Sequence, residues 1–377
     1  RLYPASPAAE LLAALPQPPA PAAVRSACHV LTQLGAIEPR RPDDRADGAR
    51  DESLTPIGYH LAALPVDVRL GKLLLLGACL GQTDAALTLA AALSCRSPFA
   101  APFGMREEAD EARRVLSVGE SDHLTLLHAY RQWDALPSSA EKATFCAAHF
   151  LSFKGLETLR ATRRELFAHL RAAGFAPVGA EADCARGGGE AYPEMLKALL
   201  VGAMWPRVAK VEAAGGGGKR GVGKRAAAAD GGPIKLRIKD DCGVMGAGLH
   251  PSCLLAHRSA GAQRGARAKM SAVVFTEAVR TSALLVRDVS PVSPVALLLF
   301  GGNLHHDAKA GLVAIDDGWF RFRVGADVAA VLLLVRRELD ALLERKMGAP
   351  DAEIGGSRAL VDGITRLIDA CGAVVQA

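Results

Sequence analysis

Hydrophobic positions follow a helical period at both ends of the chain and a strand period in one region between them. Apolar residues from Val24 to Leu34 recur at helical spacing, and Gly35 follows at the position that a helix C-cap favours. Thr55 as an N-cap and Pro56 as the first helical residue predict another short helix. The first 65 residues are therefore expected to form a small helical unit.

The next hundred residues read as helical throughout. Two segments are too apolar for surface helices and predict the middle of a bundle, and Ser121 suits the N-cap of an amphipathic helix. The helices predicted up to the Trp205-Pro206 pair cover residues 70–80, 83–93, 122–133, 154–172 and 192–203.

Arg163 interrupts the apolar stripe of the 154–172 segment, seven residues after Leu156. A cation in that position extends its charge to solvent, pairs with a buried acid, or faces a cavity that holds a ligand. The sequence leaves these three alternatives open.

A different pattern begins after Pro206. Residues 215–232 are rich in Gly, Ala, Lys and Arg and predict a disordered insertion. Residues 233–239 alternate apolar and basic side chains with the period of a strand, which gives one apolar and one basic face. Further strands are expected at 272–279, 283–289 and 295–300, with a turn at Gly301-Gly302, and short strands at this spacing suggest a small barrel. Amphipathic helices at 327–346 and 357–370 complete a multidomain α+β prediction.

Composition narrows the class of protein. The chain has 377 residues, of which 50% are hydrophobic and 23% charged, so two or three globular domains are expected. No apolar run reaches the roughly 18 residues of a membrane helix, and we expect no membrane partner.

Eight cysteines without a C-x-x-C pair argue against zinc and disulfides and favour buried thiols in an intracellular protein, cytoplasmic or nuclear. Because the sequence starts at Arg1 and has no secretory signal, we expect a fragment or a processed product.

Positive charge is concentrated in one part of the chain. The net charge is +5, whereas residues 215–290 alone carry thirteen Lys or Arg against five acids. A local basic excess of this kind indicates a polyanionic partner, although an ordinary solvated surface is the plain alternative.

Several motifs that suggest catalysis lack the parts that they need. The segment Gly218–Arg225 resembles a phosphate loop, but Arg225 replaces the hydroxyl residue that holds magnesium, and no buried strand precedes it. His305-His306-Asp307 gives adjacent side chains that point apart and no closed metal site. Ser121-Asp122-His123 cannot meet as a catalytic triad because the residues are consecutive. We therefore expect no catalytic, cofactor or metal site in this chain.

A series of short segments resembles the C-terminal region of DEAH/RHA-type RNA helicases. In chain order they look like the tail of the second RecA-like lobe, the junction after the winged helix, two landmarks of the ratchet domain, two of the OB-fold, and the C-terminal extension. The segments are Arg1–Tyr3, Leu54–Lys72, Ser97–Phe99, Ser121–Leu124, Leu249–Ser252, Leu297–Gly302 and Asp317–Trp319.

This resemblance implies a domain order that covers nearly the whole chain. A partial winged helix occupies 1–65, a helicase-associated ratchet bundle 66–205, an OB-fold with an insertion at 213–232 occupies 206–325, and a C-terminal helical extension 326–377. The segment before Val24 is shorter than in the family, so the first winged-helix elements are expected to be missing. The ATPase lobes, which bind ATP and Mg²⁺ in the family, have no motifs here, so the enzyme class of this chain stays open.

In the family these domains close a channel around single-stranded RNA beneath the RecA-like lobes. On this resemblance we expect Lys235, Arg237, Arg280 and Arg287 to contact the RNA backbone, with Thr281 at the same barrel surface. Arg163 and His123 are expected to line the channel from the ratchet side. Two plain alternatives remain: Arg287 pairs with Glu277 across the sheet, and His123 bonds locally in the first turn of its helix.

Two functions are compatible with these observations. The first is the RNA-binding accessory region of an ATP-dependent RNA helicase, acting in cis with RecA-like lobes and binding single-stranded or structured RNA and a regulatory or ribonucleoprotein partner. The second is a stand-alone RNA-binding adaptor without a motor. A phosphate loop and a D-E-x-H box upstream of Arg1 in the coding region would favour the first, and a start codon there the second.

Overall fold

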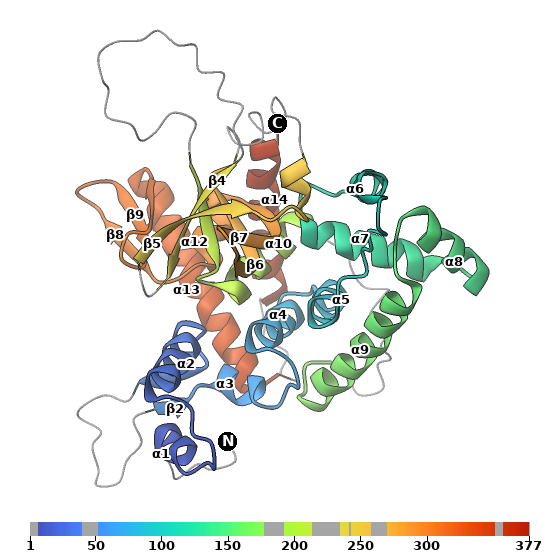
Figure 1. Ribbon diagram of the computed structural model, residues 1–377. Coiled ribbons are helices and arrows are strands. Elements are labelled where there is room, and N and C mark those ends of the chain that lie inside the picture. The colour runs from blue at the N-terminus through green and yellow to red at the C-terminus, as the bar shows by residue number, and fades with distance from the viewer. Residues whose placement is uncertain are drawn as a thin grey trace.

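A computed structural model describes residues 7–39, 52–176, 192–212, 234–240, 243–257, 270–350 and 357–376 (Figure 1). The predicted insertion at 213–232 lies outside these described residues. A helical half and a β-barrel half stand side by side, with the C-terminal helices running along both. The predicted α+β class, with a helical bundle, a small barrel and C-terminal helices, is confirmed.

The N-terminal unit joins short helices to a two-stranded hairpin. It contains α1 (Ala8–Ala13), α2 (Pro21–Gln33), β1 (Ile37–Pro39), β2 (Glu52–Leu54) and α3 (Pro56–Leu61), and β1 pairs antiparallel with β2. The predicted signals act as expected: Gly35 has a φ of +74°, and the Thr55 hydroxyl accepts a hydrogen bond from the backbone N–H of Gly58 at 3.0 Å. A Cβ atom at Gly58 would lie 1.8 Å from the carbonyl oxygen of Ala36, so the hairpin can approach α3 only at a glycine.

Seven helices form the bundle in the described part of residues 66–205. They are α4 (Val68–Cys79), α5 (Thr83–Ser94), α6 (Arg106–Val115), α7 (Asp122–Ala135), α8 (Ser139–Ala148), α9 (Phe153–Ala172) and α10 (Pro193–Met204). The two helices expected at the centre, α4 and α5, are indeed largely buried. Every residue of α10 from Glu194 to Met204 is buried, because α10 packs against α4, α12, α14 and the strands β6 and β7.

Arg163 lies inside the bundle and not on an open surface. Its side chain on α9 donates from Nη2 to Asp84 at 2.5 Å and from Nε to the Thr88 hydroxyl at 3.2 Å, both on α5. Arg131 reaches the second oxygen of Asp84 at 2.6 Å. Of the three alternatives for a cation on this stripe, the structure shows pairing with an acid, although Asp84 is half-buried and not fully buried.

The barrel is closed and has five strands. These are β3 (Val208–Val211), β4 (Lys235–Asp240), β5 (Gly243–Leu249), β6 (Ala272–Arg280) and β7 (Leu284–Val292), in the order β3-β4-β5-β7-β6. All pairs are antiparallel except β5 with β7, which are parallel. Its own core includes Leu236, Ile238, Val273 and Phe275. Three expected strands are present as β4, β6 and β7, whereas β3 and β5 are additional to those expected.

The strand expected at 295–300 is wrong, because this segment is the helix α12 (Pro294–Phe300). The Ser293 hydroxyl accepts from the N–H of Ala296 at 3.2 Å as an N-cap, and Pro294 occupies the first turn. A continuous apolar run of this length fits a buried strand or a buried helix equally well. The capping pair decides between them, since Ser followed by Pro starts a helix.

The remaining elements pack on the helical bundle. A three-stranded antiparallel sheet contains β8 (Leu304–Asp307), β9 (Leu312–Ile315) and β10 (Phe320–Arg323), and two long helices follow, α13 (Ala326–Gly348) and α14 (Ser357–Gln376). The buried residues of α12, this sheet and both helices belong to the same core as α4, α5 and α10.

A buried carboxylate joins the bundle to the barrel. Asp122, at the start of α7, is 3% exposed. Its Oδ1 accepts from Arg113 Nη2 and from the backbone N–H of Leu254, both at 3.0 Å, and its Oδ2 accepts from the N–H of Val289 in β7 at 2.8 Å. Both carboxylate oxygens are thereby used, which is what a buried charge requires.

His123, the next residue of α7, also connects the bundle to the barrel. Its ring is fully buried, with Nδ1 2.6 Å from the Ser290 hydroxyl and Nε2 2.8 Å from the Thr276 hydroxyl, on β7 and β6. The Ser121 hydroxyl, which caps α7, also lies 2.5 Å from that of Ser290. The contacts of His123 thus reach across to the barrel and are not local to its own helix turn. Burial lowers the pKa of His123, and this effect outweighs the opposing charges of Asp288 and Asp122.

We expect Arg163→Leu to lower the free energy of unfolding by about 2 kcal/mol, because it removes one of the two arginine partners of the half-buried Asp84 carboxylate and leaves only Arg131. Urea denaturation would measure this loss. Arg164→Leu is the matched control, since Arg164 is exposed on the same helix and should change stability by less than about 0.5 kcal/mol. Equal effects of the two substitutions would contradict the structural role of Arg163.

We also expect His123 to make the protein less stable in mild acid. The folded-state pKa lies below the unfolded value of about 6.5, so the unfolded chain binds the extra proton as the pH falls through about 6.5. Stability contributed by neutral His123 is therefore present above that pH and lost below it. Melting curves from pH 7.5 to 5 should show a smaller pH dependence in His123→Gln than in the wild type. An unchanged pH profile in the variant would refute this assignment.

Candidate nucleic-acid interface

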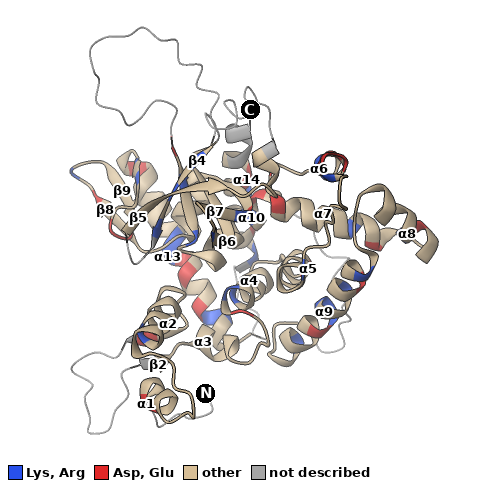
Figure 2. Cartoon of the chain, viewed as in Figure 1, with Lys and Arg blue, Asp and Glu red and all other residues tan. Residues whose placement is uncertain are grey.

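The basic face expected on the first long strand of the barrel is present on β4 (Figure 2). Lys235 and Arg237 are exposed, while their neighbours Ile234, Leu236 and Ile238 point into the barrel core. Neither cation has an ion-pair partner among the described residues. The period of two in the sequence therefore gives the predicted separation of charge from core.

Neighbouring strands extend this basic face on one side and leave it open on the other. Lys210 of β3 stands in register with Arg237. On the other side, Lys235 and Arg237 face Gly248 and Gly246 of β5, which add no side chains. The strand register thus puts cations beside a strip of bare backbone, a shape that a phosphate chain can approach closely.

Aromatic rings border the basic face. The Lys210 ammonium lies 4.4 Å from the ring centre of Trp319 and 5.2 Å from that of Phe320. Burial, followed by the charges of Arg237 and Arg321, lowers the pKa of Lys210. Lys239, at the far end of β4, pairs with Asp317, and the hydrogen bond from Lys239 lowers the pKa of that carboxyl. Sequence reasoning missed Lys210, because β3 is only four residues long, and it assigned Trp319 to the C-terminal extension and not to this surface.

The other expected barrel contacts lie around the β6–β7 hairpin. Arg280 and Thr281 are exposed there, with Arg280 Nη2 3.5 Å from the sulfur of Met245. Arg287 stands in register with Glu277 and pairs with it at 3.4 Å, as the cross-strand alternative anticipated. Both side chains of this pair remain partly exposed, so the guanidinium still faces solvent.

Arg163 and His123 do not belong to this surface. Both are buried, at 2% and 0% exposure, and both have protein partners in the bundle and at the bundle–barrel joint. The expectation that they line a channel is dropped, because neither polar group can reach a ligand without disrupting those contacts. The residues predicted from the sequence therefore fall into three sets. The β4 group is Lys235 and Arg237, and the hairpin group is Arg280, Thr281 and Arg287. Arg163 and His123 have structural roles.

Other motifs contribute no site in the part of the chain that the structure describes. His305 and His306 lie on β8 as consecutive, outwardly exposed positions of a strand, so their rings point to opposite sides. No group of three or more metal-binding side chains occurs among the described residues. No described helix has the length and apolar character needed to cross a membrane. The phosphate-loop-like segment Gly218–Arg225 lies outside the described residues.

Three family models match successive parts of the chain. A winged-helix model of the helicase-associated domain (HA2) matches residues 29–66, and a ratchet-like model of the same domain matches 67–126. A model for the C-terminal domain in RNA helicases matches 312–370. The first runs from the end of α2 through α3, the second from α4 to the start of α7, and the third from β9 into α14.

Curated relatives match across most of the chain. The putative ATP-dependent RNA helicase DHX57 of Mus musculus is 32% identical over 93% of this chain and 26% of its own length. The ATP-dependent RNA helicase dhx29 of Xenopus laevis is 30% identical over 88% and 22%, respectively. The ATP-dependent DNA/RNA helicase DHX36 of Bos taurus is 29% identical over 91% and 31%.

The chain thus spans about a quarter of the length of these relatives. The winged-helix, ratchet and C-terminal models follow one another in the order in which the structure places the N-terminal unit, the bundle and the last helices. This chain carries the winged-helix and ratchet-like parts of the helicase-associated domain and the C-terminal domain found in RNA helicases, and its relatives are DEAH-box RNA helicases.

Proposed function

We propose that this chain is the RNA-binding accessory region of an ATP-dependent DEAH-type helicase, and that it holds single-stranded RNA by its phosphates. The observation that carries the proposal is the outer face of β4, where Lys235 and Arg237 are exposed and have no acidic partner among the described residues. With Lys210 and Lys239 they form a cationic strip beside bare β5 backbone.

This strip suits a backbone contact better than base recognition. Ammonium and guanidinium groups on neighbouring strands follow phosphates of any sequence, whereas base readout needs side chains positioned against base edges. Trp319 and Phe320 at the border offer aromatic surface, but Lys210 already covers both rings. We therefore expect low sequence specificity and a strong dependence on salt.

The remaining parts of the proposal concern the whole protein. ATP and Mg²⁺ would bind to RecA-like lobes in cis, and this chain would form part of the RNA channel beneath them. A regulatory or ribonucleoprotein partner is compatible with this role, as is action inside the cell, cytoplasmic or nuclear. The relatives support these proposals, since two of them are named as ATP-dependent RNA helicases and the third as an ATP-dependent DNA/RNA helicase.

The first test measures the affinity for an unstructured single-stranded RNA as a function of salt. Four phosphate contacts predict a log–log slope of about −3. The double variant Lys235→Ala/Arg237→Ala should weaken binding for all sequences and reduce the steepness of the slope by about 0.7 for each residue lost. The control is Lys154→Ala/Arg164→Ala, two exposed cations of α9 outside the strip. A slope near zero in the wild type, or equal loss in both double variants, would refute the β4 interface.

The second test separates the hairpin group from the β4 group. Arg280→Ala/Arg287→Ala should weaken RNA binding and leave the melting temperature unchanged, because an exposed pair such as Arg287–Glu277 contributes less than about 1 kcal/mol. Fluorescence anisotropy and thermal melting on the same samples would measure both effects. Parallel loss of binding and melting temperature would identify these arginines as structural, and full retention of binding would confine the interface to β4.

A further inference from the structure

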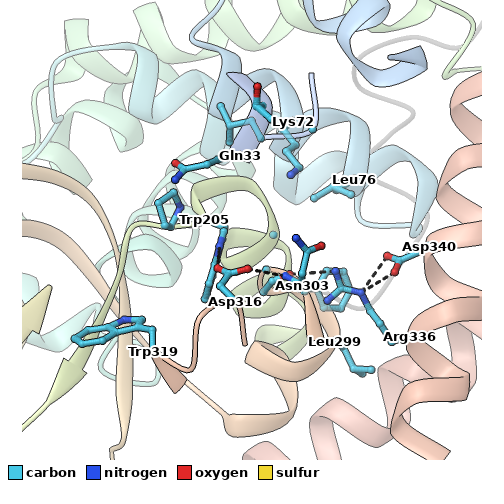
Figure 3. A pocket seen from close by; sticks show the side chains of 18 of the residues that line it. Gln33, Lys72, Leu76, Trp205, Leu299, Asn303, Asp316, Trp319, Arg336 and Asp340 are labelled. Carbon is cyan, nitrogen blue, oxygen red and sulfur yellow. Dashed lines mark hydrogen bonds and ion pairs between the residues drawn. The ribbon is translucent and has the colours of Figure 1, made fainter. Parts of the chain in front are cut away.

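A cavity of about 730 Å³ lies where the N-terminal unit meets the C-terminal region (Figure 3). Its wall is formed by the end of α2, by α4, by the turn after α12, by the β9–β10 turn and by α13. Cavities of this size at the junction of domains are typical of small-molecule sites. Lys235 and Arg237 do not line it, whereas Lys239 at the end of the cationic strip and Trp319 at its border do, so the cavity adjoins the proposed RNA contacts without including the two β4 residues that carry them.

The acidic groups in the cavity wall are already engaged by protein donors. Asp340 accepts from Arg336 Nε at 2.9 Å, and Asp317 pairs with Lys239. Asp316 accepts from the backbone N–H of Asn303 at 2.8 Å and from Trp205 Nε1 at 3.1 Å. The carboxylates of the wall are therefore bound to donors of the protein itself.

Lys72 is the exception among the charged groups of the wall. It projects from α4 toward the space between Gln33, Asn303 and Arg336, as Figure 3 shows, and none of the described residues forms an ion pair or a hydrogen bond with its ammonium group. Burial and the nearby charge of Arg336 lower its pKa to about 8, although Asp340 opposes this shift. A lysine held in this way is largely charged at neutral pH and has no direct ion pair, because the nearby Asp340 is bound to Arg336, so binding of an anion would be favourable.

Neutral donors lie near this ammonium group in the same wall. The Asn303 side-chain amide is exposed and has no hydrogen-bond partner among the described residues, and Figure 3 places it facing the cavity. The turn that carries Asn303 must contain glycine, since a Cβ atom at Gly302 would lie 2.2 Å from Asp316 Oδ1. Asp316 thus holds this turn against the wall and positions Asn303 at the cavity.

We propose that this cavity binds a small organic phosphate of mononucleotide size, whose phosphate pairs with Lys72 and whose polar remainder reaches Asn303. A phosphate suits this wall because a lysine ammonium binds phosphate as a point charge, and because the guanidinium of Arg336, which could bind a carboxylate or a phosphate, is already bound to Asp340 and to two backbone carbonyls. The cavity is also far larger than an inorganic ion needs. Because the N-terminal unit and α13 both line the cavity, a bound ligand would hold these two regions together.

The test titrates the whole chain with AMP and follows tryptophan fluorescence at constant ionic strength. Two of the three tryptophans, Trp205 and Trp319, line the cavity, and the third, Trp133, is buried in α7. AMP should change the fluorescence, inorganic phosphate should compete with it, and N-acetylglutamate should bind at least tenfold more weakly than AMP. Lys72→Met should weaken AMP binding tenfold or more, whereas Lys154→Met, an exposed lysine on α9, should bind like the wild type.

A pH series on the wild type gives an independent readout that needs no variant. A phosphate monoester is already dianionic above about pH 7, so a loss of affinity between pH 7.5 and 9.5 reports the loss of the Lys72 charge. An ordinary exposed lysine would keep its charge to about pH 10. The other charged or titratable groups that face Lys72 or line the cavity are Arg69, Arg336, Asp340, His29, Lys239, Asp316 and Asp317.

Several results would overturn the proposal. These are the absence of any fluorescence change with AMP, equal AMP binding by Lys72→Met, a flat affinity up to pH 9.5, or binding of N-acetylglutamate as tight as that of AMP, which would indicate an acidic peptide. The double variant Lys235→Ala/Arg237→Ala should bind AMP normally. Failure of this test is therefore distinguishable from failure of the RNA proposal.

Discussion

The buried carboxylate of Asp122 determines how the two halves of the molecule face each other. It connects α6, through Arg113, with the backbone of both β7 and the 3₁₀ turn that begins at Leu254. Removing any of these donors would leave part of a buried charge unpaired, so the bundle and the barrel have little freedom to rotate against each other. This fixed orientation covers β6 and β7 with α7 and α10, and leaves β4, on the opposite side of the barrel, available for a ligand.

Most helices could be predicted from the sequence because their apolar period is long and their ends carry caps. Thr55, Ser121 and Gly35 act as the sequence indicated. The failures have a common physical origin in short segments. The helix α12 is a seven-residue apolar run whose period is undefined, and β5 contains three glycines that give it no alternation. The capping pair Ser293-Pro294 decides the conformation of α12, whereas pairing with β4 and β7 decides that of β5, and such pairing is not visible in one sequence.

The candidate site was predictable to the extent that it depends on one strand. Lys235 and Arg237 alternate with core residues, and that alternation alone determines that they face outward. Arg163 could not be assigned in this way, since its partner Asp84 lies 79 residues earlier in the chain. Lys72 shows no signal in the sequence at all, because a single lysine within an apolar helix most often reaches solvent along its own stem. Lys72 lies in a cavity wall only because elements from three distant parts of the chain meet there.

The complete burial of α10 has a consequence for how this protein folds. A helix with no solvent-facing side exposes apolar surface to water until neighbours have packed on every side of it. Those neighbours come from the bundle, the barrel and the C-terminal helices. Neither half can then be expected to form a stable core alone, so the chain should melt in one cooperative transition. Fragments of the chain cut between the bundle and the barrel would expose this apolar surface and aggregate.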